Sequence, residues 1–226
     1  MSTPLQTTAI TNIPVVVGNL LSASYEGLPN NLPNSYGNYL VVWRNQNTIP
    51  WNDATPDGYA PIEGNSSQGS QVVDQIEINV GVSYIVGYAV GPKGSGANMT
   101  WENVCATAFI PASATDPVTY KSSALNNFQV LSDSVTMNFQ LPDGATPKTN
   151  GAWVGIWQTG QASYTTAPVA SNAITIDSSQ GGAAINGVSI LRGQVYTVAL
   201  FTSGWKAGAG GVNVQTAMAC TATITT

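Results

Sequence analysis

The chain has 226 residues, of which only 8% are charged, and its net charge is −5. Four lysines and two arginines are scattered along it, which argues against binding to nucleic acids or anionic membranes, because both require clustered cations. The absence of histidine excludes Ser-His-Asp and Cys-His triads and removes the commonest zinc ligand, so we expect neither enzyme activity nor a cofactor.

The N-terminal segment, residues 1–21, does not have the form of a signal peptide. It has no basic region, and its apolar run is interrupted by Asn12, Pro14 and Gly18. No segment approaches the ~20 apolar residues of a transmembrane helix, so we expect no transmembrane segment. The localisation stays open, and an extracellular location would require export by a route without a classical signal peptide.

Short strands are predicted throughout the first half of the chain. "YLVVW" (39–43), "QVVDQIEIN" (71–79), "SYIVGYAV" (83–90) and "VCATAFI" (104–110) are rich in β-branched and aromatic residues or alternate between apolar and polar side chains. Clusters of Gly, Pro, Asn and Asp separate them, and no stretch keeps a helical period. The pattern is typical of an antiparallel β-protein.

The long connection after the first of these strands, about residues 44–69, contains the first candidate ligand-binding residues. Exposed aromatic rings can stack on the apolar face of a sugar, while amides and carboxylates bind its hydroxyl groups. The sequence "WNDATPDGY" offers both kinds of side chain within one loop. The candidates there are Trp51, Asn52, Asp53, Asp57 and Tyr59.

Two other uses of the acids in this loop are open. Asp53 and Asp57 are also a candidate calcium site, although their spacing is not that of an EF-hand loop. They are moreover close enough in sequence to form a hydrolytic carboxylate pair, which is the last of the functional alternatives.

The second half of the chain repeats the first. "GNYLVVW" (37–43) returns as "GAWVGIW" (151–157), "SSQGS" (66–70) returns as "SSQGG" (178–182), and further matches follow in the same order. We therefore expect two tandem homologous domains, residues 1–116 and 121–226, joined by the Pro-containing segment 111–121. In both halves the SSQG motif is expected to turn the chain into the next strand.

The second half keeps only part of the candidate site. Its long connection, about 158–181, has Tyr164 as a further candidate ligand-binding residue but lacks the acids of the first copy. Cys105 and Cys220 occupy equivalent places in the last predicted strand of each half, which favours small core residues over a disulfide.

The predicted fold class is all-β, with two tandem homologous antiparallel β-sandwich domains. Six or seven short strands in ~110 residues favour an immunoglobulin-like topology, and a jelly roll is the competing one. The predicted function is non-enzymatic recognition of a glycan or cell surface through the long loops. The alternatives are a self-assembling structural or coat protein, which would be a homo-oligomer, and a secreted toxin or effector that acts on a membrane or receptor.

Overall fold

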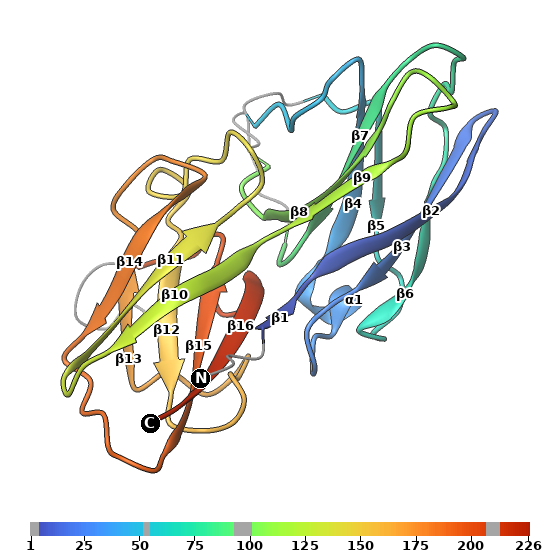
Figure 1. The fold of residues 1–226 in the computed structure, drawn as a ribbon. Helices are drawn as coiled ribbons and strands as arrows, with labels where there is room; N and C mark the ends of the chain where they lie inside the picture. The colour runs from blue at the N-terminus through green and yellow to red at the C-terminus, as the bar shows by residue number, and fades with distance from the viewer. Residues whose placement is uncertain (1–4, 52–54, 93–100, 207–212) are drawn as a thin grey trace. The chain divides into compact units, whose positions relative to one another are not determined.

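Antiparallel strands form most of the regular structure in the computed structural model, which describes residues 5–51, 55–92, 101–206 and 213–226 (Figure 1). The helix in this part of the chain is the short α1 (Pro33–Tyr36). Within the same ranges no helix is long and apolar enough to cross a bilayer. The prediction of an all-β protein built from antiparallel sheets is confirmed.

The chain divides into two compact units. The N-terminal unit contains Thr8–Ser122 together with Pro142–Gly144, and the C-terminal unit contains the residues up to Thr7, Ser123–Leu141 and Ala145–Thr226. Among the described residues, each unit has one three-stranded and one five-stranded sheet.

The N-terminal unit joins its three-stranded sheet in the order β2-β3-β6 and its five-stranded sheet in the order β5-β4-β7-β8-β9. The strands are β2 (Ala9–Val17), β3 (Leu20–Glu26), β4 (Tyr39–Arg44), β5 (Gly58–Pro61), β6 (Gln68–Val73), β7 (Tyr84–Ala89), β8 (Val104–Ile110) and β9 (Thr119–Ser122).

The C-terminal unit has the same arrangement, with sheet orders β10-β11-β14 and β13-β12-β15-β16-β1. The strands are β1 (Leu5–Thr7), β10 (Ala124–Val130), β11 (Ser134–Gln140), β12 (Trp153–Trp157), β13 (Ala170–Ala173), β14 (Gln180–Asn186), β15 (Val195–Phe201) and β16 (Met218–Thr225).

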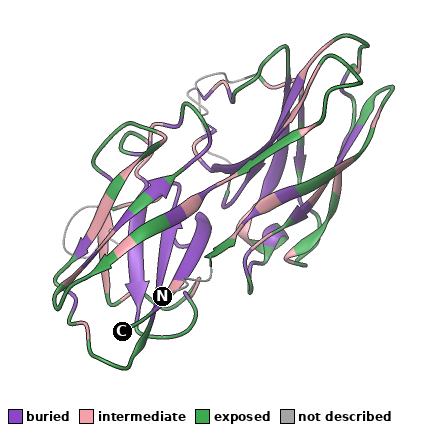
Figure 2. Ribbon diagram, viewed as in Figure 1, coloured by how far each residue is buried: buried purple, intermediate pink, exposed green. Residues whose placement is uncertain are grey.

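Alternating side chains of the three-stranded sheets form one core in each unit. Leu21, Ala23 and Tyr25 of β3 are buried, and the Tyr25 ring lies 5.1 Å from that of Tyr88 on β7. In β11 the residues Val135, Met137 and Phe139 are buried in the same way. The intervening residues face outward, as the two-residue period of a strand requires (Figure 2).

The central strands of the five-stranded sheets, such as β4, β7 and β15, are buried on both faces, which explains why they read as continuous apolar runs. On β4 the outer face carries Tyr39 and Trp43, and Trp101 packs edge-on against Trp43 with ring centroids 5.2 Å apart. A Cβ placed on Gly87 of β7 would lie 3.2 Å from Ile49. Side chains of the long connections therefore cover the outer face of this sheet as a second core.

A tyrosine at the start of one strand ties down the preceding connection in each unit. The Tyr84 hydroxyl accepts from the Asn79 amide at 2.8 Å and donates to the Glu77 carbonyl at 3.2 Å. Tyr196 makes the equivalent pair of bonds, with Leu191 at 3.0 Å and with the carbonyl of Ser189 at 3.3 Å. This arrangement is a tyrosine corner.

The observed units differ from the predicted boundaries, 1–116 and 121–226, at three places. The strand β1 pairs with β16 in the C-terminal unit, and β9 pairs with β8 in the N-terminal unit. The segment Pro142–Gly144 also belongs to the N-terminal unit, where the Asp143 carbonyl accepts the indole N–H of Trp51.

Both cysteines lie at fully buried positions. Cys105 is on β8 and Cys220 on β16, each with 0% of its surface exposed, and no disulfide joins them. Burial raises the pKa of the Cys105 thiol, so the reactive thiolate is suppressed there.

Candidate functional site

A hollow with a volume of about 900 Å³ lies on the C-terminal unit. It is open to solvent and lies where the outward-facing side chains of β11 and β14 meet β13 and the irregular part of β10. We call it the amide groove because five of its lining side chains are carboxamides. They are Asn127, Gln129, Asn138, Asn172 and Asn186.

The register between β11 and β14 determines which residues form the floor of the amide groove. Asn138 of β11 pairs with Gly182 of β14, and Thr136 pairs with Ala184. Because residues opposite each other in a ladder point to the same face, a polar side chain on β11 stands beside a residue with little or no side chain on β14. The missing bulk at positions 182 and 184 leaves the hollow.

A second, contiguous hollow of about 320 Å³ extends the groove along the same face of the sheet. It shares Asn138 and Gly182 with the first and adds Asn126, Gln140 and Gln180. The combined surface follows β11 over most of its length.

An irregularity and a hydrogen bond shape the two sides of the groove. The β10–β11 register shifts between Asn126 and Gln129, and Asn127 has φ 53°, so this bulge turns its side chains toward the groove. On the other side the Asn172 carboxamide of β13 accepts from the Asn186 amide of β14 at 3.1 Å. That bond holds the edges of the two sheets together.

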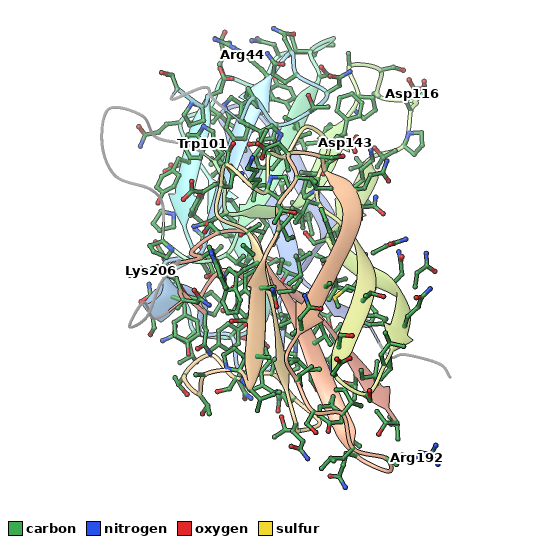
Figure 3. The ribbon with its side chains drawn as sticks, turned by 90° about the vertical axis from the view of Figure 1, so that its left-hand side faces the viewer. Arg44, Trp101, Asp116, Asp143, Arg192 and Lys206 are labelled. Carbon is green, nitrogen blue, oxygen red and sulfur yellow. The ribbon has the colours of Figure 1, made fainter. Side chains whose placement is uncertain are left out.

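The lining is neutral, since neither Asp, Glu, Lys nor Arg is among its residues. Arg192 and Lys206, two of the cationic residues of this unit, lie apart from each other (Figure 3). Carboxamides both donate and accept hydrogen bonds, and the half-buried Phe128 adds an aromatic ring to the lining. The surface therefore suits an uncharged ligand with many hydroxyl groups.

The corresponding ladder of the N-terminal unit is filled instead. Ser24 of β3 pairs with Ser70 of β6, and their hydroxyls lie 2.8 Å apart. Ser22 pairs with Val72, whose side chain is exposed. Hydroxyl and isopropyl groups stand where the C-terminal unit has Gly182 and Ala184.

Trp51 of the predicted loop site lies in the interior rather than on the surface. Only 9% of it is exposed, and its indole N–H donates to the Asp143 carbonyl at 2.9 Å. A Cβ on Gly144, whose φ is +79°, would lie 3.0 Å from the same nitrogen. The ring therefore offers no free face for stacking on a sugar.

The other described candidates of the predicted loop site, Asp57, Tyr59 and Tyr164, each contact different residues. Asp57 binds Arg44, with one carboxylate oxygen 2.8 Å from the guanidinium Nε and the other accepting from the Arg44 amide at 2.8 Å (Figure 3 labels Arg44). Tyr59, on β5, is 37% exposed, and its ring lies 5.2 Å from that of Tyr39. Tyr164 belongs to the C-terminal unit and is half-buried.

Asn52 and Asp53 lie outside the described residues. The calcium hypothesis, which needs Asp53 beside Asp57, is therefore an open prediction. Within the described part of the chain, no three acidic or cysteine side chains are grouped as metal ligands would be.

The segment "QGGAAIN" contains the sequence signal for one side of the amide groove. Alternation there places Gly182, Ala184 and Asn186 on one face, but nothing local shows that Asn138 lies opposite.

The residues of the SSQG motif make a turn, as expected, and in the C-terminal unit they also contribute to the amide groove. Ser66 and Ser178 each accept from the amide two residues on, and Gln180 and Gly182 then line the groove.

Comparisons with known proteins give no family assignment. No family model matches the chain, and no curated protein matches it. A solved structure titled "Biofilm associated protein - BSP domain" matches over 91% of this chain, at 14% sequence identity and a TM-score of 0.23. This chain spans 27% of that one. At this TM-score the match supports no inference about fold or activity.

Proposed function

We propose that this protein is a non-enzymatic recognition protein that binds an uncharged glycan through the amide groove of its C-terminal unit. The observation that carries the proposal is the groove itself, about 900 Å³ in volume and lined by carboxamides without a charged side chain. A glycan with neutral sugars presents hydroxyl groups that donate and accept, which carboxamides match in both directions.

The length of the groove favours a chain of sugars over a single one. The two hollows share Asn138 and Gly182, so a ligand can run along β11 from the β10 bulge toward Gln140 and Gln180. The flat stretch at Gly182 and Ala184 lets the ligand approach the sheet closely. The loop that contains Trp51 is not part of this proposed site, because the Trp51 ring is buried.

The binding experiment uses soluble neutral polysaccharides of several linkage types and measures affinity by titration calorimetry. Asn138→Ala should lower affinity about 5- to 30-fold, as expected for a lost hydrogen bond of ~1–2 kcal/mol. Gly182→Gln should abolish binding, because its side chain fills the groove. No heavy atom lies within 4 Å of a Cβ at this position, and its φ is not positive, so the fold should tolerate the change.

Matched controls are present in the N-terminal unit. Ser24→Ala at a half-buried position and Gly64→Gln at an open one are the same kinds of change outside the groove and should leave affinity unchanged. Raising the NaCl concentration severalfold should also have little effect, since the ligand carries no charge. Full affinity in Gly182→Gln, or loss only in Tyr59→Ala, would move the site back to the loop.

We further propose that the two units are copies of one immunoglobulin-like sandwich. In both, the chain crosses repeatedly between a three-stranded and a larger antiparallel sheet in the same order, and both have a tyrosine corner. A jelly roll would require two four-stranded Greek keys, and the sheet orders favour the immunoglobulin-like alternative.

A further inference from the structure

The fifth strand of each large sheet comes from an unexpected part of the chain. β1 completes the sheet of the C-terminal unit, yet the residues that follow it, from Thr8 onward, belong to the N-terminal unit. β9 completes the sheet of the N-terminal unit, and the residues after it, from Ser123 onward, belong to the C-terminal unit. The two units have exchanged equivalent strands.

The two exchanged strands occupy the same place in their sheets. Each is an edge strand that runs antiparallel to an equivalent neighbour, β1 beside β16 and β9 beside β8. Each is followed after one buried residue, Thr8 or Ser123, by the first strand of the other unit's small sheet. The edge of a large sheet can therefore accept this type of strand from another part of the polypeptide.

The strand β1 is short, and most of it is exposed. It forms three residue pairs with β16, Leu5 is 43% exposed, and Gln6 is also exposed. The Thr221 hydroxyl donates to the Gln6 side chain at 3.4 Å, and the Thr7 hydroxyl donates to the Ser123 carbonyl at 2.6 Å. Segments with little buried apolar surface open locally at small free-energy cost.

Neither strand of this pair is protected against pairing with another copy. Natural edge strands often have charged residues, especially Lys, that prevent such pairing. β1 and β16 contain no charged residue, whereas the equivalent β9 contains Lys121. A connection of one residue between β1 and β2 also leaves no slack, and short connections favour strand exchange between copies.

We propose that β1 is exchanged between copies of this chain, so that β1 of one copy pairs with β16 of a second copy. The new pairing reproduces the register Leu5↔Ala222, Gln6↔Thr221 and Thr7↔Cys220, so it has nearly the same free energy as the internal one. The internal pairing prevails at low protein concentration, and exchange increases with concentration. Reciprocal exchange gives a dimer with two amide grooves.

The first experiment uses two single-cysteine chains, Gln6→Cys and Thr221→Cys, each in a Cys105→Ala, Cys220→Ala background. Neither chain can form the disulfide alone, whereas opposed residues in an antiparallel pair have Cα atoms ~4.5–5.5 Å apart, within disulfide range. The two are mixed at high concentration, warmed close to the thermal transition, cooled and oxidised. A disulfide-linked heterodimer on a non-reducing gel is the expected result.

The second experiment places both cysteines in one chain and oxidises it while dilute. This locked chain should stay monomeric in light scattering at concentrations where its reduced form and the unmodified protein dimerise after the same warming. Dimers that form equally well from the locked chain would overturn the proposal, as would an unmodified protein that stays monomeric at every concentration. Loss of glycan binding would leave these results unaffected, since the groove does not include β1.

Discussion

At the scale of single residues, the tyrosine corners show a structural role that the repeat indicated but did not explain. Aligning the two halves places Tyr84 over Tyr196, and both prove to be almost fully buried, at 2% and 0% exposure. Their hydroxyls bond to backbone groups five and seven positions earlier. The sequence alone could not show these bonds, because they depend on the path of the preceding connection.

Removing either corner hydroxyl should destabilise the protein. Tyr84→Phe and Tyr196→Phe should each lower the free energy of unfolding by about 1–2 kcal/mol, since each leaves backbone groups without their partner. Urea denaturation measures the effect, and Tyr120→Phe is the matched control because Tyr120 is 42% exposed. A loss no larger than that of the control would mean that the corner bonds do not contribute to stability.

Two other buried tyrosines should limit stability at alkaline pH. Burial raises the pKa of Tyr39 and of Tyr88 well above 10, and in Tyr88 this outweighs the opposing effect of the hydrogen bond from Asn38. The unfolded chain releases these protons near pH 10 while the folded chain keeps them. Their contribution to stability is therefore complete below pH 10 and decreases above it.

The expected slope is up to about 1.4 kcal/mol per pH unit for each of the two tyrosines. Guanidinium denaturation at several pH values from 8 to 11.5 measures it, and Tyr88→Phe should have a shallower slope above pH 10 than the parent. Equal slopes in the two proteins would contradict the assignment to Tyr88.

At the scale of elements, most strands could be predicted and the burial of the loops could not. The apolar runs at 39–43 and 83–90 correspond to β4 and β7. The predicted strand 71–79 ends early, at Val73, because Gln75 has φ 58° and turns the chain. The hypothesis that Trp51 stacks on a sugar requires an exposed ring, but the outer face of the large sheet needs apolar cover, which loop residues such as Ile49 and Trp101 also provide.

At Gly58, strand β5 lies so close to the end of β6 and to Ile76 that only glycine fits. A Cβ there would lie 2.2 Å from Ile76 and 2.6 Å from Val73, both buried. Gly58→Ala should lower the free energy of unfolding by about 1–3 kcal/mol, as overpacking of a core does. Thermal denaturation followed by circular dichroism tests this, with Gly64→Ala as the control, where a Cβ meets no atom within 4 Å.

At the scale of the whole molecule, the two units have equivalent sheet orders, but the sequence repeat does not show where the short strands pair. The segments "LQT" and "TYKS" are too short to show a strand pattern in the sequence. Their partner strands are distant in sequence for "LQT" and across a connection for "TYKS". The amide groove could not be predicted for the same reason, because it depends on strand pairing. Asn138 and Gly182 are both visible in the sequence, whereas their opposition in a ladder is a property of the folded sheet.

The position of β1 also has a consequence for folding during synthesis. Gln6 and its partner Thr221 are 215 positions apart, so β1 emerges from the ribosome long before β16 exists. At about 5–20 residues per second, β1 spends roughly 10–40 s without its partner strand. The N-terminal unit can close once residue 144 has emerged, while the C-terminal sheet must wait for the last strand. Each nascent chain on a crowded polysome thus presents an unpaired strand to its neighbours.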